Sequence, residues 1–122
     1  MTQVLVVHNE EGARRATRAV VNAAPGFDVV GEAASAEEAL ELAVAVRPSL
    51  ALVAVGMPGI DGFETSRRLV VALPEITVLL LYTSVKPAED NVAWSQAVAA
   101  LHDGTLAPTS LRAAWDEHSG AG

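Results

Sequence analysis

Two short runs of this chain, 49–55 (SLALVAV) and 76–82 (ITVLLLY), are almost wholly apolar and carry no charge. Strands without polar alternation are typical of a parallel sheet that helices cover on both faces. The runs 3–7 (QVLVV) and 27–33 (FDVVGEA) have the length and β-branched content of further strands, and a short fifth strand is predicted near 98–101. These runs place the chain in the α/β class.

The segments between these runs predict helices. A helix is expected over 10–24, with Pro25 and Gly26 ending it and with core-facing residues Ala13, Ala16, Val20 and Ala23. Ser35 and Glu38 have the spacing of a capping box, which opens a second helix that ends at Arg47. Three more helices are predicted over 62–73, over 88–96 and after Pro108. Strand and helix therefore alternate about five times, as in a doubly wound sheet.

Composition narrows the functional classes. The 122 residues suit one domain, which we expect over 1–118 with 119–122 as a tail or linker stub. A net charge of −7 argues against direct binding to nucleic acid by this domain, and the absence of cysteine excludes disulfides and cysteine zinc sites. No run approaches the ~18 apolar residues of a membrane span, and the first residues lack a signal-peptide pattern, so a cytoplasmic location is expected.

Doubly wound sheets bind ligands outside the carboxyl ends of their strands. Here those positions are 8–10, 54–56 and 82–84. The turn VVHNEEGA lacks the glycines of a dinucleotide site, and Glu10 with Glu11 would repel a phosphate. One acid beside a histidine, an amide and an alanine makes a poor site for Mg²⁺. We therefore expect no metal and no cofactor.

A catalytic interpretation would make His8 a base and Ser84 a nucleophile, with Asp103 orienting the imidazole. The three histidines are scattered along the chain, and a single histidine at a strand end is more often a packed or hydrogen-bonded side chain. We therefore expect that the chain is not an enzyme.

Four segments follow one another in a familiar order and spacing: VLVVHNE, GFDVVGEAASAEEALELA, RPSLALVAVGMPGIDGFE and LPEITVLLLYTS. They resemble the receiver domains of bacterial response regulators, most of all those of NarL/LuxR-type transcription regulators. The resemblance covers Val4 to about Ser84 and is weak beyond. It implies a doubly wound (βα)5, flavodoxin-like or CheY-like fold, whose five parallel strands lie in the order 2-1-3-4-5.

The sequence departs from this family at its phosphorylation site. The family places two acids after the first strand to hold Mg²⁺, and this chain has His8 and Asn9 there. The phosphate-accepting aspartate at the end of the third strand falls on Ala54. Since an alanine cannot accept a phosphoryl group, the resemblance implies a receiver that has lost this chemistry and its Mg²⁺.

Two further family positions also differ. The switching threonine or serine at the end of the fourth strand falls on Tyr82, with Thr83 beside it. The family's lysine after the fifth strand falls on Gly104, or on His102 if the register slips by two residues. Neither register supplies the cation. We expect a pseudo-receiver whose stability is indifferent to Mg²⁺.

Several functions fit a pseudo-receiver. The leading hypothesis is a phosphate-independent interaction module at the front of a transcription regulator. A homodimer is then expected through the face of the fourth helix, fifth strand and fifth helix, to which we assign Trp94, Leu101 and Trp115.

Three alternatives remain. The domain could sense a small molecule in a pocket at His8, Ala54 and Tyr82, or it could be a stand-alone adaptor that sequesters a signalling partner. Residual phosphorylation would require another acceptor, such as Thr83, Ser84 or Asp61.

Overall fold

The computed structural model describes residues 1–119, and its centre is a five-stranded sheet. The strands are β1 (Thr2–Val7), β2 (Phe27–Ala33), β3 (Leu50–Ala54), β4 (Thr77–Tyr82) and β5 (Ala99–His102). All neighbouring strands are parallel, and their order is β2-β1-β3-β4-β5. This confirms the doubly wound sheet and the strand order that the sequence predicted.

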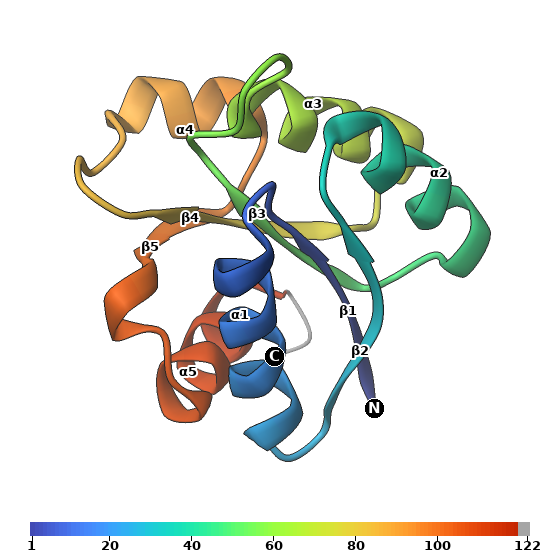
Figure 1. The fold of residues 1–122 in the computed structure, drawn as a ribbon, viewed down its shortest axis with the longest axis vertical. Helices are drawn as coiled ribbons and strands as arrows, with labels where there is room; N and C mark the ends of the chain where they lie inside the picture. Colours follow the sequence, from blue (N-terminus) through green and yellow to red (C-terminus); the bar gives the residue numbers. More distant parts are fainter. Residues whose placement is uncertain (120–122) are drawn as a thin grey trace.

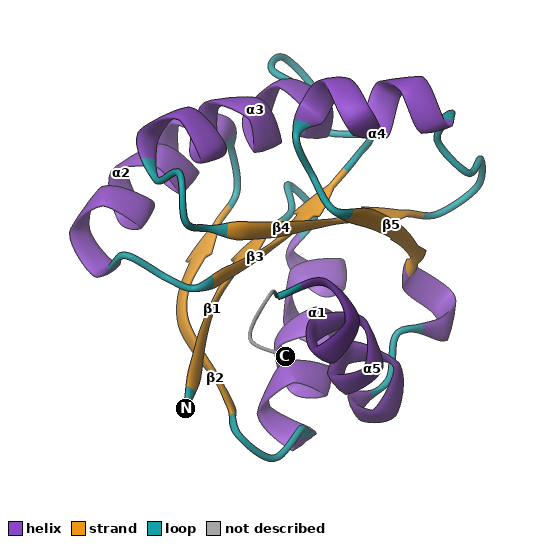
Figure 2. Cartoon of the chain, turned by 180° about the vertical axis from the view of Figure 1, so that it is seen from behind, coloured by secondary structure: helices purple, strands orange, loops and turns teal. Residues whose placement is uncertain are grey.

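Helices cover both faces of the sheet. They are α1 (Glu11–Ala23), α2 (Ala36–Val46), α3 (Gly62–Ala72), α4 (Glu89–Ser95) and α5 (Pro108–His118). Figure 1 shows α1 and α5 together on one face and α2, α3 and α4 on the other, and Figure 2 shows the same layers from behind. A 3₁₀ turn over Asp103–Thr105, which the sequence did not predict, joins β5 to α5. Ser119 caps α5, and the rest of the predicted tail lies outside the described residues.

Each face of the sheet has its own core, because alternate residues of a strand point to opposite faces. The core under α2, α3 and α4 contains Leu5, Val7, Ala51, Val53, Val78 and Leu80. The core under α1 and α5 contains Val4, Val6, Leu50, Leu52, Leu79 and Leu81. The central strands lack polar alternation because both of their faces are buried. Burial stabilises each such leucine or valine by about 1.5–3 kcal/mol.

The buried face of α1 differs from the predicted one. The structure buries Thr17 and Val21 on this helix, whereas Ala16 and Ala23 are exposed. Thr17 can be buried because its hydroxyl donates a hydrogen bond to the carbonyl of Ala13 at 2.9 Å. The prediction was therefore wrong at Ala16 and Ala23, because it counted only apolar side chains as core residues.

The start of α2 has half of the predicted capping box. The Ser35 hydroxyl accepts a hydrogen bond from the Glu38 amide at 3.2 Å, as expected for an N-cap. The Glu38 carboxylate, however, accepts from the amide of Ala34 at 2.7 Å rather than from that of Ser35. The Glu38 side chain therefore satisfies the backbone amide of Ala34, one residue before the N-cap, and not that of Ser35 as predicted.

The junction between β3 and α3 is tightly packed. The Asp61 carboxylate accepts a hydrogen bond from the Glu64 amide at 3.0 Å and caps α3. A Cβ on Gly62 would lie only 2.1 Å from the carbonyl oxygen of Ala54. The glycine thus lets the first turn of α3 lie directly on the end of β3, where the ligand-binding edge of such a sheet lies. Among the described helices, none is long and apolar enough to cross a membrane.

Candidate functional site

The ends of β1, β3 and β4 meet at a pocket of about 280 Å³. Its walls are His8, Asn9, Glu10, Ala54, Val55, Gly56 and the segment 81–85. The structure thus brings together the three strand ends that the sequence singled out. Of the seven predicted site residues, His8, Asn9, Ala54, Tyr82 and Thr83 line the pocket, whereas His102 and Gly104 do not.

His8 is the most buried polar side chain of the pocket wall, with 9% of its surface exposed. Its Nδ1 accepts a hydrogen bond from the Glu10 amide at 3.1 Å, so the neutral ring carries its proton on Nε2. Burial lowers the pKa of His8 below its ordinary value of 6.5. The carboxylates of Glu10 and Asp103 oppose this shift, and the guanidinium of Arg14 reinforces it. The imidazole is therefore held as a neutral donor.

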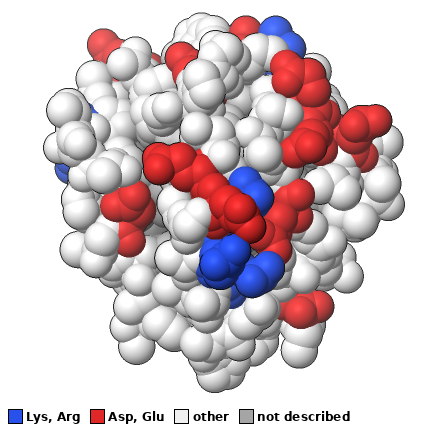
Figure 3. Space-filling view, viewed as in Figure 1, with Lys and Arg blue, Asp and Glu red and all other residues white. Residues whose placement is uncertain are grey.

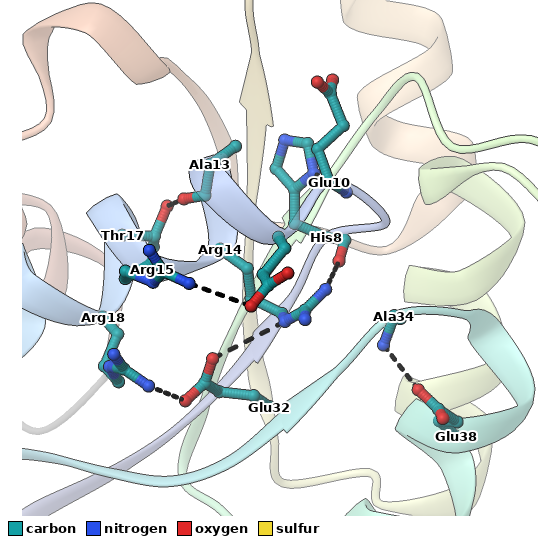
Figure 4. Close-up of polar contacts among 11 residues, drawn as sticks. His8, Glu10, Ala13, Arg14, Arg15, Thr17, Arg18, Glu32, Ala34 and Glu38 are labelled. Atoms are coloured by element: carbon teal, nitrogen blue, oxygen red, sulfur yellow. Dashed lines mark hydrogen bonds and ion pairs between the residues drawn. The ribbon is translucent and has the colours of Figure 1, made fainter.

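An ion-pair cluster on α1 fixes the loop that carries His8 (Figure 4). Arg14 donates a hydrogen bond to the His8 carbonyl at 2.9 Å, and its Nε lies 3.6 Å from the Glu32 carboxylate. Arg18 binds the other oxygen of Glu32 at 2.9 Å. Figure 3 shows basic and acidic side chains next to one another over α1. The guanidinium of Arg14 thus links the His8 carbonyl to Glu32 on β2.

Two contacts join the ends of β4 and β5 at the rim of the pocket. The Thr83 hydroxyl donates to the Asp103 carboxylate at 2.7 Å. Strand pairing sets Tyr82 beside His102, and the two rings meet edge to face with centroids 5.4 Å apart. His102 in turn accepts a hydrogen bond from the Gly104 amide through Nδ1 at 3.0 Å.

The two positions predicted for the family's lysine, His102 and Gly104, lie on either side of an acid, Asp103. The Asp103 carboxylate interacts with Thr83 and with His8. From the sequence, Asp103 is expected only as the group that would orient a catalytic histidine. Asp103 directly follows β5, which would have placed it at the strand-end edge, but the weak residue pattern of β5 left the end of that strand uncertain.

The pairings of a catalytic site are not formed. His8 and Ser84 both line the pocket, yet no hydrogen bond joins them in the part of the chain that the structure describes. Asp103 holds Thr83 and does not hold His8 by a hydrogen bond. The arrangement lacks the nucleophile–base–orienter chain that activates a serine.

The oxygen ligands at this pocket do not fit Mg²⁺. Glu10 lines the pocket, and Asp103 lies beyond its lining residues with one carboxylate oxygen already accepting a hydrogen bond from Thr83. Within residues 1–119, no group of three or more histidine, cysteine, aspartate or glutamate side chains is placed to hold a metal ion. A hard cation needs several oxygen ligands in one shell, which these side chains do not supply.

The two tryptophans assigned to one interface lie on opposite faces of the sheet. Trp94 on α4 is 49% exposed and packs under the guanidinium of Arg67 from α3, 4.9 Å from its ring centre. Trp115 on α5 meets Phe27 edge to face at 6.4 Å in the core under α1 and α5. Leu101 packs half-buried against that same core. Of these three side chains, only Trp94 is largely exposed, whereas Leu101 and Trp115 are half-buried.

A separate groove runs along the outer edge of β5. It has a volume of about 460 Å³, and its walls come from α4, β5 and the segments before them. Its apolar lining residues include Pro87, Val92, Ala93, Ala97, Val98 and Ala100. Neither tryptophan lines this groove, whose walls also include the charged residues Lys86 and Glu89.

Comparison with known sequences gives one consistent result. The pattern of the family described as "Response regulator receiver domain" matches residues 4–102. A protein-glutamate methylesterase/protein-glutamine glutaminase of Myxococcus xanthus is 39% identical over 86% of this chain and 28% of its own length. The DNA-binding transcriptional activator DevR/DosR of Mycobacterium tuberculosis is 38% identical over 75% of this chain and 43% of its own length. The chain thus spans less than half the length of these relatives.

Solved structures with the same fold cover the whole chain. A LuxR-family response regulator from Aurantimonas has a TM-score of 0.86 at 21% identity, covering 98% of this chain and 86% of its own. The response regulator domain of Thermotoga maritima CheB also reaches 0.86, at 19% identity and with 100% and 98% coverage. The receiver domain of NarL from Mycobacterium tuberculosis has a TM-score of 0.82 at 25% identity, covering 99% of this chain and 98% of its own.

Proposed function

Because the chain belongs to the family of response regulator receiver domains, we propose that it is a receiver that signals without being phosphorylated. It acts as a regulatory interaction module and not as an enzyme, and it is a pseudo-receiver of the NarL/LuxR type. Its partners are proteins, and its state is set by association or by a ligand.

The side chain of Ala54 carries this proposal. Ala54 ends β3 at the wall of the pocket, and its methyl group offers no oxygen to a phosphoryl group. Phosphoryl transfer to a carboxylate needs that carboxylate, a metal ion and a cation on the transferred oxygens. Glu10 and Asp103 supply negative charge where a phosphoryl group needs positive charge. The wall and the rim of the pocket therefore both disfavour the reaction.

Intact-mass measurement tests the proposal. The native chain is incubated with acetyl phosphate and Mg²⁺, beside an Ala54→Asp variant and a phosphorylatable receiver as a positive control. We expect no added phosphoryl group on the native chain. We also expect no stoichiometric addition on Ala54→Asp, because His8 and Asn9 still replace the metal-binding acids. A stoichiometric, Mg²⁺-dependent addition to the native chain would contradict the proposal and direct attention to Thr83, Ser84 or Asp61.

We assign the protein partner to a second copy of the chain, bound through the α4-β5-α5 face. The apolar groove beside β5 supports this assignment, since Val98 is 39% exposed there and small residues surround it. Sedimentation velocity of the native chain should show a dimer, and Val98→Glu should shift it to the monomer. The matched control is Val71→Glu, which adds the same charge at a residue that is 77% exposed on α3. Equal behaviour of the two variants would overturn the assignment.

The output we propose is transcriptional control in the cytoplasm. The relative named as a DNA-binding transcriptional activator supports this, although the methylesterase relative shows that similar receivers occur in proteins of another kind. This domain itself should leave DNA unbound, because its net charge is −7. Fluorescence anisotropy with a labelled duplex checks this point, and a salt-dependent rise in anisotropy would contradict it.

A second candidate function is ligand sensing, and the pocket at the strand ends favours it. The pocket of about 280 Å³ is near the lower size limit of small-molecule sites. Its wall combines the buried His8 side chain, whose Nδ1 accepts from the Glu10 amide, with the apolar Ala54 and Leu81. Saturable binding of a small molecule to the isolated domain would support this function.

A further inference from the structure

The loop after β1 contains a contact that depends on the protonation state of His8. In this loop His8 and Glu10 lie side by side (Figure 4), and the backbone amide of Glu10 donates a hydrogen bond to His8 Nδ1 at 3.1 Å. A neutral imidazole offers one ring nitrogen as an acceptor, whereas an imidazolium carries hydrogens on both nitrogens and accepts nothing. Since Nε2 already carries the proton of the neutral ring, a second proton binds at Nδ1, and the bond from Glu10 cannot coexist with it.

The backbone of His8 is anchored independently of its ring. Its amide donates to the Ala33 carbonyl at 3.0 Å, and its carbonyl accepts a hydrogen bond from Arg14 at 2.9 Å. Glu32 on β2 lies 3.6 Å from the same guanidinium. Because both backbone groups of His8 are fixed, we expect a proton on Nδ1 to turn the side chain and shift the backbone at 9–10, while β1 stays in place.

Charged groups from several elements face the His8 ring. Burial lowers its pKa and keeps the ring neutral at pH 7. The carboxylates of Glu10, in the loop after β1, and of Asp103, after β5, oppose this effect, and the guanidinium of Arg14 on α1 reinforces it. The pocket-lining residues of β3 are uncharged, and β4 contributes the phenol of Tyr82. Two carboxylates are therefore ready to stabilise the ring once it becomes positive.

Asp103 connects the His8 ring to the end of β4. Its carboxylate accepts the 2.7 Å hydrogen bond from the Thr83 hydroxyl, and it also acts electrostatically on His8. A hydrogen bond between an imidazolium and a carboxylate is stronger than one from a neutral hydroxyl. A positive ring at position 8 therefore competes with Thr83 for this carboxylate.

We propose that His8 is an acid-sensitive switch that couples the loop after β1 to the loop after β4. At neutral pH the ring accepts the bond from the Glu10 amide. When a proton from solvent binds Nδ1, that bond breaks, the ring turns, and the Asp103 carboxylate exchanges Thr83 for the imidazolium. Both loops then rearrange at the strand-end edge of the sheet, which gives the domain a proton as its input. The switch does not depend on the proposed function, because proton uptake by His8 involves no phosphoryl group.

An NMR titration of the isotope-labelled chain between about pH 7.5 and pH 5 tests the switch. The ring protons of His8 are followed together with the backbone amides of Glu10 and Thr83. We expect all three to change with one shared midpoint below 6.5, the ordinary pKa of histidine. The Glu10 amide should move toward the chemical shift of an amide without a hydrogen bond.

A substitution of His8 separates this cause from other titrations. In His8→Asn the side-chain oxygen takes the place of Nδ1 as an acceptor but binds no proton in this range, so the transitions of Glu10 and Thr83 should be lost. The matched control is His102→Asn, because His102 also accepts an amide hydrogen bond through Nδ1, from Gly104 at 3.0 Å. His102 lies beside Tyr82 at the same rim. This variant should keep both transitions.

Two carboxylate variants test the coupling. Asp103→Asn should keep the Glu10 transition and lose that of Thr83, because the exchanging charge is gone. Glu10→Gln should keep both transitions at a lower midpoint, because the Glu10 carboxylate raises the pKa of His8. Dispersed amide spectra show that each variant is folded, and these two variants serve if His8→Asn does not fold.

Any one of four results would overturn the switch. The first is a His8 ring that binds no proton above about pH 5, and the second is a Glu10 amide that does not follow the ring. The third is persistence of both transitions in His8→Asn. The fourth is a Thr83 transition that survives in Asp103→Asn.

Discussion

Thr83 donates its hydroxyl hydrogen to the carboxylate of Asp103 over 2.7 Å, across the ends of β4 and β5. Beside this bond the rings of Tyr82 and His102 meet edge to face. The two contacts hold the loop after β4 against the turn after β5, at the rim of the strand-end pocket. Thr83 therefore has a hydrogen-bond partner within the chain.

The first prediction concerns this hydrogen bond. Thr83→Val should lower the free energy of unfolding by about 0.5–1 kcal/mol, since the bond is charge-assisted but exposed. Urea denaturation of Thr83→Val, Asp103→Ala and the double variant gives the coupling energy. Ser84→Ala, which removes a neighbouring hydroxyl, should be neutral. A coupling energy of zero would show that the bond does not hold the two strand ends.

Magnesium provides a second prediction. The midpoint of thermal unfolding of the native chain should not change on adding Mg²⁺, because the oxygen ligands at the pocket do not fit this ion. The triple variant His8→Asp, Asn9→Asp and Ala54→Asp restores the family's acids and should acquire a Mg²⁺-dependent rise. A rise in the native chain would contradict the prediction.

The third prediction concerns the pH dependence of stability. Because the pKa of His8 is lowered in the folded chain, the unfolded chain binds more protons at pH values between this lowered pKa and 6.5. The free energy of unfolding should therefore decrease as the pH falls through 6.5 toward the folded pKa, and this contribution should be constant below it. Urea denaturation at several pH values checks the slope, which should be smaller in His8→Gln. An NMR titration that finds the pKa of His8 above 6.5 would reverse the sign.

The fourth prediction concerns two glycine-to-alanine changes that should alter stability in opposite directions. Gly62→Ala should be strongly destabilising, by several kcal/mol or enough to prevent folding, because its Cβ would lie 2.1 Å from the Ala54 carbonyl oxygen. Gly12→Ala should stabilise by about 0.5–1 kcal/mol, since the position is helical and open. Thermal unfolding of both variants tests this. A tolerated Gly62→Ala would mean that α3 can move away from β3.

The residue pattern alone predicts the sheet and the edge at which its strands end. The apolar runs in β3 and β4 predict a sheet buried on both faces, and strand length limits their ends to within one residue. The presence of His8 and Ala54 at neighbouring strand ends also follows from sequence order, because parallel strands all end at the same edge. That position 54 carries an alanine and not a carboxylate is read directly from the sequence and needs no structure.

Which further side chains lie at that edge, and which surfaces form, depends on the packing of the folded chain. Asp103 lies in a 3₁₀ turn that no periodic pattern predicts, and its carboxylate accepts a hydrogen bond from Thr83, which lies 20 residues earlier. Trp94 and Trp115 lie on opposite faces because their helices cover opposite sides of the sheet. Local patterns report propensity and burial along one element, whereas these relationships depend on contacts between elements that only the packed chain brings together.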